Sequence, residues 1–403
     1  MYKLIIKLAF NNAFLKLSRT LLIIIMIAVS MGMMLSIQGI YDGMTLNMID
    51  NTKRSDSGDV SIYNKEYRLN KLLKNSIKDS RVIVEELKKR SEIDAIVVRM
   101  KTEGLSSTAR KSAFSSIIGI NLKDEEKFGR FSEFLKKGKL NLEKRNALIG
   151  SELAKTLKIK IGSKVIFSTQ DSLGEIIAIS VKISGIVQTS NMSLDTTALY
   201  VDRNKLNNFL EINSKTNTQI AIMSKDKLLI SELKKTYSTF DVKSFLELYP
   251  MLKQMKDVMV IFNSITFFIV MFVVFIGILG VMYVSILDRV REFGILRSIG
   301  MPYKYIRIQV VLESLIIGFI GYVFGSIIGI CALQYLQTIG LDLSSFADGM
   351  ESFGYETTIH ADIKLSYFTS TFMAIMSASI ISVFLPLRKI KTCNPIEVIK
   401  ADS

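Results

Sequence analysis

The sequence LDRVREFGILRSIGMP occupies residues 287–302 and separates two long apolar runs. An Arg or Asp at the centre of a bilayer costs roughly 3 kcal/mol on insertion scales, so this charged segment cannot lie in lipid. We therefore place it at a membrane surface, where a protein outside the membrane can push it. No G-x-x-x-x-G-K-[ST] motif occurs in the sequence, so the push is expected to come from a separate protein.

Charged and apolar residues are interleaved within this segment. The charged residues are Arg291, Glu292 and Arg297, and the apolar ones are Phe293, Ile295, Leu296 and Ile299. Such a mixture places an apolar stripe against one neighbour and charges against another, which favours a docking helix over a solvated loop. Gly294 and Gly300 allow a close approach or a turn, and Pro302 ends the pattern.

Four apolar runs are long enough to span a membrane as helices, since one span needs about 20 residues. They are residues 21–40, 258–287, 308–336 and 367–385. A mean hydropathy of +0.32 together with 22% charged residues is too apolar for a typical soluble protein and too charged for a wholly embedded one. The chain is therefore predicted to combine four spanning helices with a sizeable polar domain.

The first apolar run could also be a cleaved signal peptide. Its apolar stretch is longer than the usual core of about 7–15 residues, and no small-x-small cleavage site follows it cleanly. We expect an uncleaved anchor. The formal net charge of +15 is compatible with nucleic acid, but basic residues beside spanning helices and anionic lipid explain it more simply. Membrane lipid is therefore an expected partner and nucleic acid is not.

Charges in the short loops predict the orientation. The N-terminal segment carries four basic residues and no acid, and basic residues also outnumber acids in 288–307 and in the C-terminal tail. Residues 338–364 instead carry five acids against Lys364 alone. By the positive-inside rule, both termini and the 288–307 segment lie in the cytoplasm, and the large polar domain lies outside the cytoplasmic (inner) membrane.

The predicted organisation has nine parts. They are an interfacial amphipathic helix (1–18), a first span (19–44), an external domain (45–256), a second span (257–287), a cytoplasmic helix (288–304), a third span (305–337), an external loop (338–364), a fourth span (365–387) and a cytoplasmic tail (388–403). The second span is about 30 residues, or about 45 Å, so it either tilts or projects beyond about 30 Å of hydrocarbon.

The external domain is expected to be mixed α/β, with one core or two small lobes. Runs rich in β-branched residues predict strands at 95–99, 115–120, 164–168, 175–187 and 197–201. Helices are predicted at 81–90 and 151–157, and 123–139 is expected to form exposed helix or loop. The chain has one histidine, His360, and two cysteines, Cys331 and Cys393. It therefore lacks the side chains that most hydrolytic mechanisms need. No catalytic residue, metal site or cofactor is expected in this chain.

The third span carries two further features. Gly318, Gly321, Gly325 and Gly329 form a stripe of small residues, which lets helices approach closely in lipid. We favour packing within the bundle over a dimer interface. Glu313 lies about two turns inside the same span, where an acid marks a candidate functional site. Pairing with a basic residue, Arg307 or one on another helix, is favoured over a proton relay.

Several segments resemble the type VII ABC transporter permeases, which are the FtsX, MacB and LolC/LolE proteins. REFGILRSIG (291–300) is similar to their R-x-E-I-G-I-L-R-A-x-G segment. Glu313 and the glycines that follow it resemble their E-x-x-x-x-G-x-x-G-x-x-x-G pattern. Pro386 and PIEVIKA (395–401) resemble their closing P-x-E-A-L-R motif, and residues 147–201 resemble the MacB-type external core domain.

The resemblance implies an α-helical integral membrane protein with four transmembrane helices and a mixed α/β extracytoplasmic MacB-like core domain between helices 1 and 2. It implies a second permease subunit, in a homodimer or heterodimer, and two cytoplasmic ATPase subunits that bind ATP and Mg²⁺. The segment 289–301 would be the coupling helix of a mechanotransmitter. The residues expected to contact the ATPase are Arg289, Arg291, Glu292, Phe293, Gly294, Leu296, Arg297, Ser298, Gly300 and Met301.

Two segments resemble the lipoprotein-releasing permeases in particular. GIYDGM (39–44) is similar to the end of their first span, and SGDVSI (57–62) to the strand that follows, with Asp59 in place of the common His. This implies a LolC/LolE-like permease that passes acylated lipoproteins to a periplasmic carrier. A MacB-like exporter of peptide, antibiotic or other cargo, and an FtsX-like signalling protein, are the alternatives. Candidate lipid-chain contacts are Met33, Met34, Ile37, Tyr41, Phe262, Ile265 and Ile269.

Overall fold

The structure is a computed structural model that describes residues 2–171, 173–226, 228–346, 349 and 357–392. It divides into two compact units. Unit 1 contains Met1–Met44, Lys256–Asp342 and Thr358–Ser403, and unit 2 contains Thr45–Met255 and Leu343–Thr357. The predicted closing motif at 395–401, Cys393 and part of the predicted loop 338–364 lie outside the described residues.

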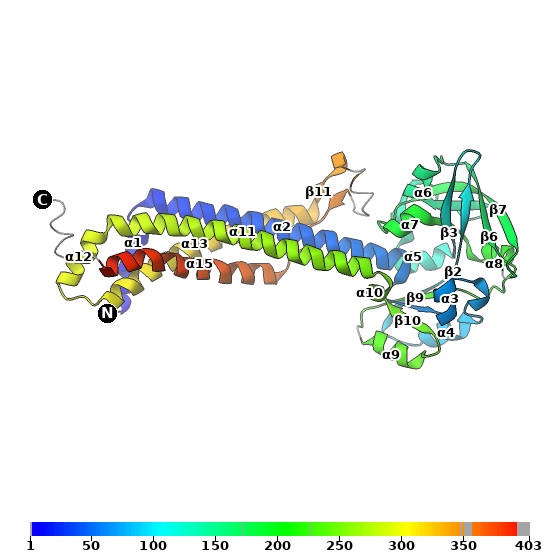
Figure 1. Cartoon of the computed structure of the whole chain (residues 1–403), viewed down its shortest axis with the longest axis horizontal. Helices are drawn as coiled ribbons and strands as arrows, with labels where there is room; N and C mark the ends of the chain where they lie inside the picture. Colours follow the sequence, from blue (N-terminus) through cyan, green and yellow to red (C-terminus); the bar gives the residue numbers. More distant parts are fainter. Residues whose placement is uncertain (1, 172, 227, 347–348, 350–356, 393–403) are drawn as a thin grey trace. The chain divides into compact units, whose positions relative to one another are not determined.

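Unit 1 is built from long helices (Figure 1). They are α2 (Leu17–Thr52), α11 (Pro250–Asp288), α13 (Tyr303–Thr338) and α15 (Leu365–Thr392). Each is long and apolar enough to cross a membrane, judged by length and composition. Shorter elements complete the unit: α1 (Tyr2–Ala13), α12 (Val290–Ser298) and the paired strands β11 (Leu341–Asp342) and β12 (Thr358–Ile359). Helices α2 and α11 each continue into residues of unit 2.

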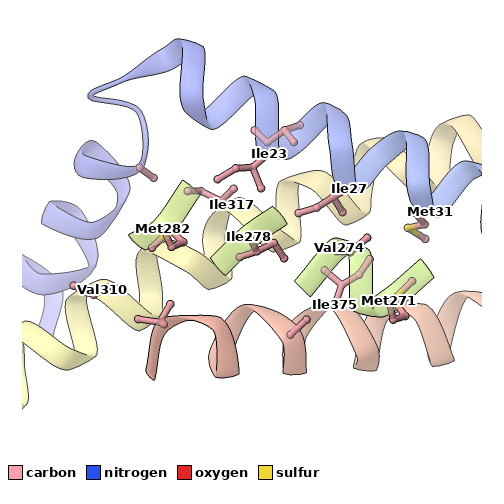
Figure 2. Packing of buried hydrophobic residues seen from close by; sticks show 14 of the residues in the cluster. Ile23, Ile27, Met31, Met271, Val274, Ile278, Met282, Val310, Ile317 and Ile375 are labelled. Carbon is pink, nitrogen blue, oxygen red and sulfur yellow. The ribbon is translucent and has the colours of Figure 1, made fainter. Parts of the chain in front are cut away.

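One hydrophobic cluster joins the four long helices. Figure 2 shows it with side chains from α2, α11, α13 and α15, including Ile27, Val274, Ile278, Ile317 and Ile375. The buried residues of α11 recur every three or four positions and are Met271, Val274, Ile278, Met282 and Ile286. That spacing places them on one helix face, so the other faces of α11 stay exposed within this chain.

Glycines set the distance between α2 and α13. A Cβ atom at Gly321 or Gly325 would lie 2.9 Å from the nearest side-chain atom of α2, and one at Gly329 would lie 2.3 Å from it. The α2 side chains at these three positions are Ile27, Met31 and Leu35. Gly318 instead faces Ser379 of α15. The stripe therefore packs helices of the same chain closely together.

Two more glycines, Gly39 and Gly43, lie in α2 just before the point where the helix passes from unit 1 into unit 2. A Cβ at Gly43 would lie 1.9 Å from the carbonyl oxygen of His360, which leaves no room for any side chain. The amide of Asp362 donates a hydrogen bond of 2.9 Å to the carbonyl of Gly39. Asp42 accepts hydrogen bonds from Lys364 and Tyr367. The segment GIYDGM thus fastens α2 to the chain that leads into α15.

Unit 2 is a mixed α/β domain built on one large sheet. The strands are β1 (Val60–Tyr63), β2 (Ile93–Ser107), β3 (Ser112–Ile120), β4 (Leu135–Gly138), β5 (Asn146–Gly150), β6 (Lys164–Gln170), β7 (Ile176–Val187), β8 (Ala198–Asp202), β9 (Gln219–Ser224) and β10 (Asp241–Ser244). They follow the order β10-β1-β9-β2-β3-β8-β5-β7-β4, and β6 pairs with β2 and β7. Pairing is mostly antiparallel, with parallel contacts between β3 and β8 and between β5 and β7.

Helices cover this sheet and connect its strands. They are α3 (Lys65–Asn70), α4 (Ser80–Leu87), α5 (Leu122–Gly129), α6 (Ser151–Thr156), α7 (Met192–Thr197), α8 (Arg203–Phe209), α9 (Leu229–Thr236) and α10 (Phe245–Leu248). A five-residue π-helical turn, η1 (Lys53–Ser57), follows α2 directly. Short 3₁₀ turns lie at Leu73–Asn75, Phe131–Phe134 and, in the 343–357 segment, Ser344–Phe346.

The domain has two lobes with separate hydrophobic cores. One core takes Ile62 of β1, Ile222 of β9 and Leu233 of α9, while the other lobe is built around β3, β5, β6, β7 and β8. The 15-residue strand β2 pairs with β9 on one side and with β3 on the other, so it belongs to both lobes. Of the two arrangements considered from the sequence, the structure has the two-lobed one.

The five predicted strands and both predicted helices are confirmed, with longer bounds for most strands. The prediction for 123–139 is wrong in part. Glu125 and Phe128 of α5 are buried, as are Phe131 and Phe134 after it. The stretch looks solvated because charges surround these residues in sequence. Glu125, however, pairs with the buried Arg99 of β2, and the aromatic rings lie in hydrophobic clusters.

Candidate functional site

The candidate site is α12 and the residues that hold it between α11 and α13. A Schellman motif ends the helix: Gly300 has φ +97°, its N–H donates to Arg297, and the N–H of Met301 donates to Leu296, both at 3.0 Å. Glycine is required at such a positive φ. Pro302 is then the N-cap of α13. The local sequence therefore stops α12 after nine residues and turns the chain sharply.

The inward face of α12 packs against the long helices of unit 1. Phe293 is 1% exposed, and Leu296 and Met301 pack against the cluster of long helices. Arg289, which precedes the helix, is also buried, and its guanidinium donates a 2.9 Å hydrogen bond to Glu313 of α13. It also donates at 3.1 Å to Glu292 and lies 5.2 Å from the centroid of the Phe293 ring.

Two of the predicted ATPase contacts have buried side chains. Arg289 and Phe293 are buried inside unit 1, where their side chains hold α12 against the long helices. Gly294 is buried as well, with open space where a Cβ would lie. Glu313 pairs with a basic residue outside its own helix, as one of the two favoured interpretations proposed; the partner is Arg289, the N-cap of α12, rather than Arg307.

Asp288, which precedes Arg289, links the start of α12 to the beginning of α2. Its carboxylate accepts a hydrogen bond of 2.5 Å from Lys16 and another from Arg19. Asp288 ends α11 and Arg289 follows it, so adjacent residues fasten this corner to α2 and to α13. The residues that precede α12 are therefore linked both to α2 and to α13.

The outward face of α12 combines apolar and charged groups. Ile299 is 79% exposed and Ile295 is 46% exposed. Around them lie the exposed Arg291, Glu292 and Ser298, and Arg297 is half-buried. Neither isoleucine was among the predicted contacts. Their four-residue spacing with Arg291 was the available signal, because positions 291, 295, 298 and 299 share one helix face.

The candidate lipid-chain contacts divide into two groups. Met33 is 64% exposed and shares a helix face with the half-buried Ile37 and Tyr41, and Phe262, Ile265 and Ile269 of α11 are all exposed. Met34 is fully buried. It points into the protein rather than onto that face, so it is removed from the candidate set. Over the described ranges, no group of three or more His, Cys, Asp or Glu is placed to hold a metal ion.

Comparison with known families gives two matches. The MacB-like periplasmic core domain family matches residues 20–236, which is more than half of the 403 residues. The FtsX-like permease C-terminal family matches residues 264–395, a range that includes α12, Glu313 and the glycine stripe. Together the two matches cover most of both units.

Similar proteins include permeases named for different roles. "Lipoprotein-releasing system transmembrane protein LolC" from Buchnera aphidicola subsp. Schizaphis graminum is 31% identical over 229 residues, which are 53% of this chain and 55% of that protein. "Macrolide export ATP-binding/permease protein MacB" from Haemophilus ducreyi is 24% identical over 60% of this chain and 35% of that protein. The chain thus matches about half the length of the LolC protein and about a third of the length of the MacB protein.

Two solved structures also align with the chain. The extracellular domain of the transporter YknZ from Gram-positive bacteria aligns with 46% of this chain and 98% of its own, at 13% identity and a TM-score of 0.32. The periplasmic region of MacB from Actinobacillus actinomycetemcomitans aligns with 48% of this chain and 92% of its own, at 17% identity and a TM-score of 0.33.

Proposed function

Since the chain belongs to the MacB/FtsX/LolC type of ABC transporter permease, we propose that it couples ATP hydrolysis in a separate cytoplasmic ATPase to movement of its external domain. The observation that carries the proposal is the outward face of α12. Exposed isoleucines ringed by charges form the kind of surface that becomes an interface core with a polar rim.

The way α12 is held supports a mechanical role. Asp288 fastens the corner to α2, and Arg289 fastens it to α13 through a buried ion pair. A push on α12 by the ATPase therefore moves the bundle instead of bending a free loop. The helix itself would supply no chemistry, and ATP and Mg²⁺ would bind in the partner subunits.

The length of the helices supports relay beyond the membrane. At 1.5 Å per residue, the 36 residues of α2 extend about 54 Å and the 39 residues of α11 about 58 Å, against about 30 Å of hydrocarbon. Both helices continue into residues of unit 2. In this proposal both termini and α12 are cytoplasmic, unit 2 is periplasmic, and a second permease subunit completes the membrane part.

We further propose that the cargo is an acylated lipoprotein, which the transporter releases from the membrane to a carrier. The LolC relative supports this choice, as does the resemblance of GIYDGM (39–44) to the end of the first span in lipoprotein-releasing permeases. The exposed Met33, Phe262, Ile265 and Ile269, with Ile37 and Tyr41, are the proposed contacts of the acyl chains. The MacB relatives support export of another cargo as the second candidate.

Depletion of the chain in its native host tests the cargo. We expect acylated lipoproteins to accumulate in the inner membrane within a few generations, because nothing else in the proposal extracts them. Re-expression of the wild-type chain should reverse the accumulation. Fractionation of the membranes, followed by detection of a tagged lipoprotein, gives the measurement. Normal departure of lipoproteins from the inner membrane would contradict this cargo and favour the exporter.

A further inference from the structure

Tyr249 lies at a junction inside unit 2. It directly precedes Pro250, the first residue of α11, and its hydroxyl donates a hydrogen bond to the carboxylate of Asp56. Asp56 belongs to η1, the turn that directly follows α2. The same hydroxyl accepts a 3.2 Å hydrogen bond from the side-chain amide of Asn191, the N-cap of α7. One oxygen atom therefore links the start of α11 to two other segments, η1 and the N-cap of α7.

Asp56 is firmly fixed on its other sides. Its carboxylate also accepts from Lys101 of β2, and its backbone carbonyl accepts from Arg99 and, at 3.2 Å, from Gln219. Arg99 in turn makes two hydrogen bonds, of 2.6 and 2.7 Å, to the buried Glu125 of α5. These contacts seat η1 on the sheet, so the end of α2 has a defined position in the domain.

The start of α11 is also tied to the segment after η1 by backbone contacts. Strand β1 pairs with β10, and the N–H of Phe245 in α10 donates a 3.2 Å hydrogen bond to the carbonyl of Asp59. Tyr249 is preceded by the four-residue helix α10, whose capping box joins Ser244 and Glu247. Lys53 of η1 lies 5.0 Å from the centroid of the Phe245 ring, which adds a weak contact between η1 and α10. Of the two side-chain contacts with η1, the hydrogen bond from Tyr249 to an ionised carboxylate is the stronger, because charge-assisted bonds are about twice as strong as neutral ones.

We infer that Tyr249 is a positioning residue that couples the external ends of the two long helices and passes their displacement to the lobe that carries α7. This inference rests on the proposed function, because it assigns the place at which helix movement enters the external domain. A phenyl ring at this position keeps the packing of the tyrosine. It leaves both Asp56 and Asn191 without their shared partner.

The test compares Tyr249→Phe with Tyr237→Phe in the complete transporter, reconstituted in vesicles with its ATPase. Tyr237 is a matched control in the same unit, since its hydroxyl also donates to a carboxylate, that of Glu86, at 2.8 Å. We expect Tyr249→Phe to hydrolyse ATP at the wild-type rate while cargo release per ATP falls about tenfold, the size expected for one hydrogen bond to a charged group. Tyr237→Phe should match the wild type.

Amide hydrogen exchange supplies a second readout that needs no cargo. Tyr249→Phe should exchange faster than the wild type at residues 53–57, whereas Tyr237→Phe should not. Wild-type release per ATP and unchanged exchange in Tyr249→Phe would overturn the inference. If the wild-type transporter releases nothing with ATP, the proposed function fails, and the exchange result still decides whether Tyr249 holds the junction.

A second variant covers the case in which Tyr249→Phe does not fold. Asn191→Ser keeps a side-chain oxygen for the N-cap of α7 but removes the amide that reaches Tyr249. We expect it to lower cargo release per ATP while ATP hydrolysis continues. Release at the wild-type level in a folded Asn191→Ser transporter would overturn the part of the inference that concerns α7.

Discussion

Replacing Glu313 with alanine is expected to destabilise unit 1 by about 3–5 kcal/mol, because removal of one partner of a buried ion pair leaves the other charge uncompensated. The carboxylate of Glu313 lies 2.9 Å from the Arg289 guanidinium, and both residues are buried. The measurement is the midpoint of thermal unfolding of the purified chain in detergent. Because Arg289 fastens α12 to α13, ATP-driven release should fall in the same variant.

Two controls accompany this prediction. Glu232→Ala removes an acid whose exposed pair with Arg90 has an N–O distance of 3.2 Å, and we expect it to change stability by less than about 1 kcal/mol. Replacing both members of the buried pair with methionine should recover most of the stability, because no buried charge then remains unpaired. A single Glu313→Ala variant as stable as the wild type would contradict the importance of the pair.

Reversing the charges of Glu292 and Arg297 together is expected to weaken binding of the ATPase about 100-fold or more. The combined variant is Glu292→Lys with Arg297→Glu. Placing like charges opposite each other at an interface costs several kcal/mol. Glu292 is exposed and Arg297 half-buried; the exchange removes the 3.1 Å hydrogen bond from Arg289 to Glu292 but keeps the pair of Arg289 with Glu313, so the fold should be retained. The measurement is co-purification of a separate P-loop ATPase with the tagged chain, followed by titration to obtain Kd.

The matched control for charge reversal lies in unit 2. Lys71 and Glu103 form an exposed ion pair there, and Lys71→Glu with Glu103→Lys exchanges the same two charges away from α12. This control should retain the ATPase at the wild-type level. Full retention of the ATPase by the Glu292 and Arg297 variant would count against α12 as the docking element.

The sequence predicted the helical framework well because its signals are local. Apolar runs of membrane length occur at each long helix, and the charges between the second and third runs place α12 outside lipid. The Gly-Met-Pro stop at 300–302 is also local, since a glycine at positive φ ends the helix. Each of these predictions needed only residues that are close together in the chain.

The details of the site depend on partners that are far apart in sequence. Arg289 looks like a surface charge until Glu313, on another helix, is seen to pair with it. Asp288 meets Lys16 across nearly three hundred residues. The glycine stripe predicted a close approach but not its partner, because a small residue permits any neighbour. The structure assigns that neighbour to α2 and, at Gly318, to α15.

In the external domain, too, contacts between residues far apart in sequence could not be predicted. Short strands such as β1, β5, β9 and β10 have four to six residues, which is too few for a clear periodic signal. Asp56, Arg99 and Glu125 are charged, so composition alone assigns them to the surface. All three are buried because they satisfy one another, and that pairing appears only when η1, β2 and α5 come together.

Site-directed cross-linking at α12 tests the central claim most directly. In a background with Cys331→Ser and Cys393→Ser, the Ile299→Cys chain would be treated in native membranes with a short thiol-to-amine cross-linker. The account predicts labelling from the cytoplasmic side and a cross-linked product that contains a P-loop ATPase. Labelling of residue 299 from the external side, or a product without an ATPase subunit in the assembled particle, would contradict it.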